Sequence, residues 1–280
     1  MLLPSQLVPV SFSLAAACGW GTSDFLGGHA SRRANAYVLA TIAHAAGFVL
    51  MAALALQTHA ALPTRASGEW AVAAGALGGA GLAVFYKALS TGKMGLTAPL
   101  VAVLSAGIPT AFAMITEGLP GTLPMVGLVL AGVGIWLISR TEGGGRFQEI
   151  ALAILTALGF AGFSVCIKQA GNGSALWIAA LSRASSFAVT GAIALIAARP
   201  ANMTRGSAGV GILAGCLDVT GSALFVRAAQ TGRLDTAVVL SSLYPAVTVF
   251  LARVFLKERF TRWKIVGILA ALVAVPMIAQ

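Results

Sequence analysis

The sequence predicts an all-α membrane protein of ten transmembrane helices, built as two inverted five-helix repeats. Three observations lead to this fold class. Hydrophobic residues make up 58% of the 280 residues and charged residues only 9%, with a mean hydropathy of +0.91, whereas soluble domains carry about 25% charged residues. Apolar stretches long enough to cross a bilayer follow one another along nearly the whole chain. The two halves of the sequence also align with each other.

The charge of the chain fits a membrane surface better than a nucleic acid. The net charge is +10, but the basic residues lie in pairs between apolar stretches, as at Arg32 and Arg33. Basic loops that flank apolar spans are typical of membrane proteins, because anionic headgroups attract them. We therefore expect membrane lipids, and no nucleic acid, as partners.

The cysteines indicate neither a metal site nor a redox site. Cys18, Cys166 and Cys216 each lie inside an apolar stretch and form no CxxC pair. Free cysteine in such a place behaves as a small hydrophobic residue. We expect no metal and no cofactor.

The apolar stretches define ten predicted spans, each near the length of about 20 residues that a spanning helix needs. Short turns carrying Arg, Lys, Gly or Pro separate them. The triplet Gly143–Gly145 is the best linker candidate, so a first repeat is assigned to residues 1–141 and a second to residues 146–280. The predicted spans are 8–30, 34–56, 69–89, 94–116, 120–139, 149–170, 174–197, 207–229, 234–255 and 262–279.

The internal repeat appears when the sequence is shifted by 140 residues. Gly19-Trp20 then falls on Gly159-Phe160, and Gly81 falls on Gly221. Each copy holds five predicted spans, an odd number, so the second copy must enter the bilayer from the opposite side. Inverted repeats of this kind are typical of secondary transporters that work by alternating access around a central cavity.

Few ionisable residues lie inside the predicted spans, and such residues are functional candidates by default. Asp24 shares a helix face with Trp20, a combination that suits an organic ammonium group; the alternative is an Asp bonded to nearby backbone. Arg183 and Asp218 could form a structural ion pair or bind the charged ends of a zwitterionic substrate. His44 could be a hydrogen-bonded interior histidine or a proton relay, and Lys168 is expected to extend toward the headgroups.

The second half of the chain resembles a known family of carriers. Leu240–Pro245, with the sequence LSSLYP, and Phe255–Arg259, with the sequence FLKER, resemble the second repeat of EamA-type carriers of the drug/metabolite transporter superfamily. Ala106–Pro109 and Thr116–Gly118 are weaker counterparts in the first half. Within this superfamily the chain is most similar to the YddG-type exporters of aromatic and neutral amino acids, and the resemblance implies a bacterial inner-membrane location.

The resemblance places the substrate cavity between spans 1, 3, 4, 6, 8 and 9. Proline and serine in the fourth and ninth spans agree with this, because proline frees backbone groups that a water-lined cavity can satisfy. The expected substrate-binding residues are Trp20, Asp24, Tyr86, Ser105, Phe160, Ser164, Asp218, Ser241, Ser242 and Tyr244. The expected bending points are Gly92, Pro99, Pro109, Gly232 and Pro245.

We therefore expect a secondary transporter that exports small metabolites, namely amino acids including aromatic ones. A multidrug or other metabolite exporter of the same superfamily is the first alternative, and a channel or membrane-embedded enzyme is the second. The sequence contains no HExxH, GxSxG or Walker A motif, so we expect no catalytic residues. The expected partners are a small-molecule substrate and lipids, and the oligomeric state stays open.

Two arguments disagree about the orientation of the chain. Most of the 18 basic residues lie in loops after odd-numbered spans, and the positive-inside rule then places both termini in the periplasm. The resemblance to the superfamily implies cytoplasmic termini instead. We follow the charges, because the rule holds best for short loops.

Overall fold

The computed structural model describes residues 4–31, 34–91, 94–139, 147–197, 203–255 and 262–278, and within them all side chains except those of 4–6, 86–100, 102–103, 138–139, 147–150, 249, 252–253, 264, 271 and 275–276. These residues are helical apart from short connections, and no strand occurs among them. The helices are α1 (Pro4–Ser31), α2 (Ala36–Gln57), α3 (Arg65–Thr91), α4 (Met94–Thr116), α5 (Thr122–Ser139), α6 (Phe147–Gln169), α7 (Ala175–Ala197), α8 (Arg205–Thr231), α9 (Leu234–Ser241), α10 (Tyr244–Phe255) and α11 (Arg262–Ile278).

The helices have the length and the outer surface of membrane spans. Among the described residues, five of them, α2, α3, α6, α7 and α8, contain segments long and apolar enough to cross a bilayer, and shorter apolar helices accompany them. Large apolar side chains are exposed on the outside; Ile115, Leu195 and Ile196 are each more than 80% exposed. In water such a surface would be unfavourable, whereas in a bilayer it contacts lipid. The structure therefore supports a multi-pass membrane protein.

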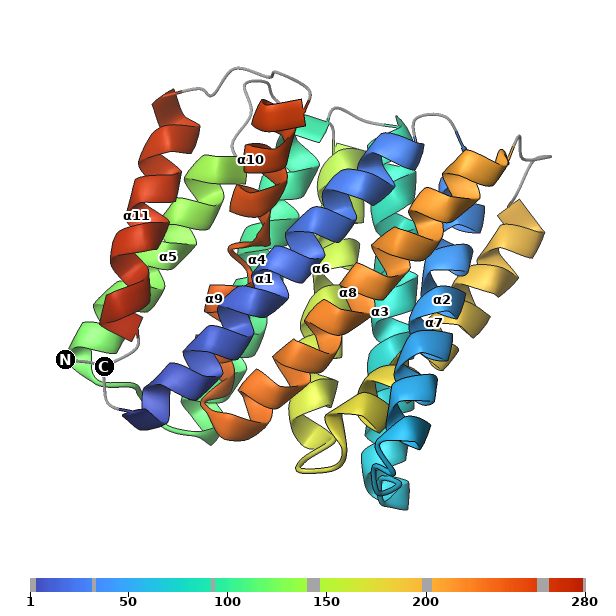
Figure 1. Ribbon diagram of the computed structural model, residues 1–280. Helices are drawn as coiled ribbons and strands as arrows, with labels where there is room; N and C mark the ends of the chain where they lie inside the picture. The colour runs from blue at the N-terminus through green and yellow to red at the C-terminus, as the bar shows by residue number, and fades with distance from the viewer. Residues whose placement is uncertain are drawn as a thin grey trace.

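The helices run between the two ends of a single bundle (Figure 1). The start of α1 and the end of α11 lie at the same end, which we call the terminal end (Figure 1). Helices α5 and α11 pack together at one edge of the bundle, and α2 packs on α7 at the other. Between them α1 packs on α8 and α3 packs on α6, so helices from the two halves of the chain pack against each other.

Glycine pairs bring α1 close to α8 and α6 close to α3. A Cβ atom added to Gly19 would lie 3.1 Å from the Cα atom of Gly221. A Cβ atom added to Gly159 would lie 2.7 Å from the Cα atom of Gly81. Side chains at these positions would force the backbones apart, and small residues are what allow helices to approach closely in membranes. Gly19 and Gly159 lie 140 residues apart in the sequence, as do Gly81 and Gly221.

The predicted span 234–255 is wrong as a single helix, because it consists of α9 and α10 joined at Ser242 and Leu243. Pro245 has no N–H group to donate to the carbonyl of Ser241, and its ring crowds the preceding turn. The chain instead makes tighter bonds, from Leu243 N to Leu240 O at 3.2 Å and from Ala246 N to Leu243 O at 2.9 Å. Each other predicted span overlaps one helix. In α4 the position 140 residues before Pro245 is Ser105, and α4 is continuous.

Candidate functional site

A cavity of about 160 Å³ lies inside the bundle. Residues from α1, α2, α3, α4, α6, α7, α8, α9 and α10 line it, whereas no described residue of α5 or α11 does. The resemblance did not place the second and seventh spans at this cavity. They contribute His44 on α2 and Arg183 on α7, among others.

Nine of the ten predicted substrate-binding residues line this one cavity; they are Trp20, Asp24, Ser105, Phe160, Ser164, Asp218, Ser241, Ser242 and Tyr244. The side chain of Tyr86 lies outside the described residues. The residues come from six different parts of the chain, so the fold brings them together from both halves. Their role in binding a substrate stays a prediction.

The predicted bending points lie in different settings. Pro245 is the second residue of α10, directly after the break, and Gly232 is the C-cap that follows α8. Pro109 is buried within α4, which continues past it. Gly92 and the side chain of Pro99 lie outside the described residues.

Arg183 is the centre of a buried polar cluster at the cavity wall. Its NH1 atom lies 3.1 Å from Oδ2 of Asp218 and 3.3 Å from Nδ1 of His44. Its NH2 atom donates to Ser222, one turn along α8 from Asp218. Arg183 and His44 are only 7% and 2% exposed. Water therefore screens the ion pair of Arg183 and Asp218 less than it screens an ion pair on the surface. The cluster joins α2, α7 and α8.

Trp20 extends the same cluster to α1. Its indole Nε1 donates to the carbonyl oxygen of Asp218 and to Oγ of Ser222, both at 3.2 Å. The Trp20 ring lies against Phe225, with centroids 5.4 Å apart, and meets Tyr244 edge-on at 6.5 Å. The tryptophan is therefore held from two sides, and it presents a fixed aromatic surface at the cavity.

Asp24 differs from the other charged residues of the cavity. Its side chain is exposed to the cavity, and it forms no ion pair or hydrogen bond with any residue that the structure describes. The alternative of an Asp bonded to nearby backbone therefore does not hold. An unpaired carboxylate beside aromatic rings is a suitable partner for an ammonium group.

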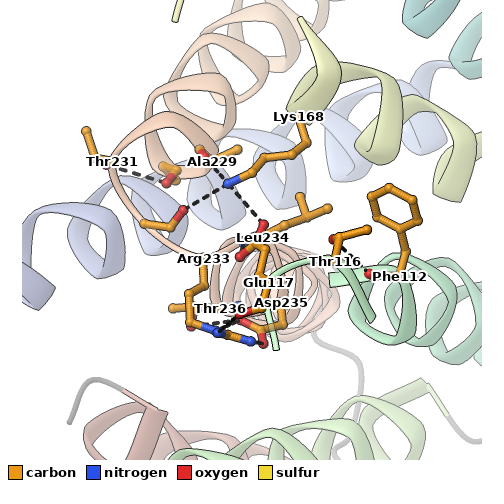
Figure 2. A network of polar contacts seen from close by, with 12 residues as sticks. Phe112, Thr116, Glu117, Lys168, Ala229, Thr231, Arg233, Leu234, Asp235 and Thr236 are labelled. Carbon is orange, nitrogen blue, oxygen red and sulfur yellow. Dashed lines mark hydrogen bonds and ion pairs between the residues drawn. The ribbon is translucent and has the colours of Figure 1, made fainter. Parts of the chain in front are cut away.

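A second charged cluster lies at the terminal end of the bundle, where α4, α6, α8 and α9 meet (Figure 2). We call it the end cluster; its charged members are Glu117, Lys168, Arg233 and Asp235. Lys168 Nζ lies 3.1 Å from Oε1 of Glu117 and donates to the carbonyls of Ala229 and Gly232 at 3.0 and 3.3 Å. Lys168 therefore bonds the end of α8 at the terminal end of the bundle.

The turn between α8 and α9 is tied to the end of α4. Arg233 NH1 donates to the carbonyl of Glu117 at 3.2 Å, and Leu234 N donates to Oε2 of Glu117 at 3.3 Å. Arg233 NH2 also pairs with Oδ2 of Asp235 at 2.7 Å, and this hydrogen bond raises the pKa of Arg233. Glu117 thus places a negative charge at the start of α9 and Lys168 a positive charge at the end of α8, the favourable positions in the field of each helix.

The predicted binding set leaves out more than half of the residues that line the cavity, among them His44, Arg183 and Phe163. Arg183 is an ionisable residue inside a predicted span, and the cost of such a charge in a bilayer is enough to make it a candidate for the site. Phe163 of α6 also lines the cavity, and it stacks on Phe225 with centroids 6.1 Å apart. No signal in the sequence distinguishes it from the other phenylalanines of the spans.

The comparisons with known proteins support a transporter. The model of the EamA-like transporter family matches residues 148–280, a range within the predicted second repeat, and this supports the drug/metabolite transporter superfamily. No curated protein matches the chain. A solved structure, titled only as the crystal structure of a protein, matches with a TM-score of 0.78 and 16% identity, over 96% of this chain and 95% of that one. At that identity it shows the fold alone.

Proposed function

We propose that the protein is a secondary transporter that exports small metabolites, with amino acids including aromatic ones as substrates, by alternating access through the central cavity. The observation that carries this proposal is the composition of the cavity wall. It combines an unpaired carboxylate, a guanidinium, serines and fixed aromatic rings inside a membrane bundle. Pockets with a few placed polar groups on an apolar wall are typical of small-molecule sites.

The packing of the helices supports an inverted repeat. The contact of α1 with α8 has its counterpart in the contact of α6 with α3. The contacts of α2 with α7 and of α5 with α11 each join a helix to its own counterpart in the other half. Exchanging the two halves of the chain leaves this set of contacts unchanged, as a two-fold axis requires. With five spans in each half, that axis lies in the membrane plane.

The size and charge of the cavity support a small substrate with an ammonium group. A volume of about 160 Å³ is below the roughly 300–1,000 Å³ of sites for drug-sized ligands. Asp24 on α1 would bind the ammonium group, and the ring of Trp20, one helical turn away, would support it by cation–π attraction. Phe160, Tyr244 and Phe163 supply apolar surface for the side chain of the substrate.

A second substrate class is favoured by one specific observation. The described wall carries two carboxylates, Asp24 and Asp218, and one guanidinium, Arg183. If all three are charged, the wall has a net negative charge, which favours an organic cation over a zwitterion. Export of organic amines, as by a multidrug exporter of the superfamily, is therefore the alternative.

The end cluster supports a state that is closed at the terminal end. It ties the turn between α8 and α9 to the ends of α4 and α6. The residues that stand 140 positions before Lys168 and Asp235 are Gly28 and Gly95, which carry no charge. Opening the terminal end would separate the ion pair of Lys168 and Glu117. In this proposal the hairpins α3–α4 and α8–α9 rock in turn, with Gly and Pro positions as the bending points.

For the orientation we keep the proposal that the charges favour, with both termini in the periplasm. The terminal end holds few basic residues, among them Arg65, Lys168 and Arg233, and the end cluster would then close the periplasmic side. A pair of C-terminal reporter fusions tests this. Alkaline phosphatase activity without fluorescence from a cytoplasm-only fluorophore is expected, and the reverse pattern would favour cytoplasmic termini.

The proposed function is tested with purified protein in liposomes. Vesicles loaded with unlabelled L-phenylalanine should accumulate labelled L-phenylalanine by exchange, saturably, and Asp24→Asn should abolish this. Ser67→Ala, on α3 and outside the cavity lining, is the matched control and should exchange normally. Linear, non-saturable flux would indicate a channel. Transport of organic amines but of no amino acid would overturn the amino-acid proposal and support the alternative.

A further inference from the structure

We propose that Gly78 of α3 and Phe163 of α6 form a size filter in the cavity. Because no side chain stands at Gly78, a substrate with a phenyl-sized group has room to pack against the ring of Phe163. This inference rests on the proposed function and deepens it, because it assigns the part of the cavity that selects substrates by the size of their apolar group. Three features of the cavity wall support it.

The first feature is the division of the wall into a charged part and an apolar part. Among the described residues, the charged side chains that line the cavity are Asp24, Arg183 and Asp218, on α1, α7 and α8. Helices α3 and α6 pack on each other and contribute no charged residue to this lining, and α3 contributes only Gly78 and Leu82. We therefore expect the apolar group of a substrate to lie against α3 and α6, away from the charges that bind its polar end.

The second feature is the surroundings of Gly78, which differ from those of the next glycine. A Cβ atom added to Gly79 would lie 2.9 Å from the Cα atom of Ser186, so Gly79 allows α3 and α7 to approach closely. For a Cβ atom added to Gly78, the three nearest atoms all belong to the side chain of Phe163, at 3.3 to 3.6 Å. Both Gly78 and Phe163 line the cavity. The small size of Gly78 therefore leaves room at the cavity wall and not at a backbone contact.

The third feature is the support of the Phe163 ring. Phe163 is only 8% exposed, and it stacks on Phe225 with centroids 6.1 Å apart. Phe225 is fully buried and lies in turn against Trp20. Because protein interiors are close-packed, the ring of Phe163 has little room to shift when a group is added beside it. A methyl group at Gly78 would therefore narrow the apolar part of the cavity and crowd a bulky substrate.

The test uses two pairs of ligands, and the members of each pair differ by one phenyl group. L-Phenylalanine is compared with L-alanine, and phenethylamine with ethylamine. Dissociation constants are measured by isothermal titration calorimetry on the purified full chain, as wild type and as Gly78→Ala. Where the smaller member binds too weakly for calorimetry, its constant is taken from competition with the larger one. Gly68→Ala is the matched control, because Gly68 lies on the same helix outside the cavity lining and its added Cβ atom would lie 3.6 Å from Cδ1 of Leu181, an ordinary contact distance.

We expect Gly78→Ala to weaken the binding of L-phenylalanine about tenfold, as overpacking of an apolar site does. The binding of L-alanine should change less than about twofold, since it has no ring to be crowded. Phenethylamine and ethylamine should show the same difference, because the filter acts on the phenyl group and not on the carboxylate. Gly68→Ala should change none of the four constants.

An equal loss for the two members of a pair would overturn the filter and show that Gly78 only accommodates Phe163 in the packing of the helices. No loss for the member with the phenyl group would overturn it as well. Should Gly78→Ala not fold, Phe163→Leu decides. It removes the ring against which the phenyl group packs, and it should weaken the larger member of each pair about fivefold more than the smaller one; an unchanged ratio of the two constants would overturn the filter.

The two pairs also separate the filter from the proposed function. If the wild type binds only one pair, that pair tests the filter, and binding of the amines alone rejects the amino-acid proposal. If the wild type binds none of the four ligands, the filter fails together with the proposed function.

Discussion

The two charged clusters of the molecule differ in how completely their groups are paired. In the end cluster every charged side chain has a partner of opposite charge, and Glu117 and Lys168 also bond the ends of two helices. In the cavity, Asp24 has no partner among the described residues. The first arrangement stabilises one conformation, whereas the second leaves interactions for a ligand. Substitutions in the two clusters should therefore separate stability from transport.

The largest loss of stability is expected from Arg183→Leu. It leaves the carboxylate of Asp218 without its cation inside the bundle, and breaking a buried pair costs about 3 kcal/mol. Thermal unfolding in detergent should show a clearly lower midpoint, and exchange of L-phenylalanine should be lost. In the double variant Arg183→Leu/Asp218→Asn the midpoint should partly recover but transport should not. Recovery of transport would mean that the pair is only structural.

A smaller loss is expected from Glu117→Gln in the end cluster, about 2 kcal/mol for weakened bonds to Lys168 and to the start of α9. Its main effect should be opening of the terminal end. Cys166 is buried on α6, two residues before Lys168, and with Cys18 and Cys216 replaced by serine it reports on that opening. Labelling by a water-soluble thiol reagent should be faster in Glu117→Gln. An unchanged rate would show that the end cluster does not hold this end closed.

Asp24→Asn should lower ligand binding without lowering stability, unlike Glu117→Gln. Because Asp24 has no described partner, removing its charge breaks no ion pair, and a neutral amide at a cavity wall inside the bundle costs less than an unpaired carboxylate there. The unfolding midpoint should stay the same or rise, while binding of both L-phenylalanine and phenethylamine falls. A lower midpoint together with normal binding would place Asp24 among the structural residues.

The smallest effect is expected at the exposed ion pair of Arg65 and Glu69. These side chains are one turn apart at the start of α3, 2.8 Å from each other, and mostly exposed. Surface pairs contribute little to stability. Glu69→Gln should change neither the unfolding midpoint nor the labelling of Cys166, and it is the matched control for Glu117→Gln. A change as large as that of Glu117→Gln would mean that the assays respond to charge alone.

The sequence predicted the positions of the helices and of much of the cavity wall because membrane helices follow simple physical rules. Apolar length determines a span, and the cost of charge in a bilayer identifies Asp24, Arg183 and Asp218. The local sequence could not predict the partners of these groups. The bond from Arg183 to Nδ1 of His44 joins residues 139 positions apart, and only the packing of α2 on α7 creates it.

Proline positions show the same limit in the fourth and ninth predicted spans. Pro245 separates α9 from α10, whereas α4 continues past Pro99 and Pro109. A proline removes one bond in either case, and whether the helix ends depends on what satisfies the freed carbonyl. Glu117 is a further example, because the sequence shows it only as an acid after the fourth span, within a weak counterpart of the FLKER motif. Its importance arises from the turn between α8 and α9, which the fold brings beside it.

The break between α9 and α10 also changes what a mutational scan of the cavity can detect. A helix end has unpaired carbonyls and a partial negative charge, and a helix start has free N–H groups and a partial positive charge. At Ser242 the end of α9 meets the start of α10, beside three residues that line the cavity, Ser241, Ser242 and Tyr244. Main-chain dipoles of both signs thus lie at the wall, and they persist when a side chain is removed. Replacing both serines by alanine would therefore leave part of the recognition surface intact, and selectivity encoded in the backbone would escape such a scan.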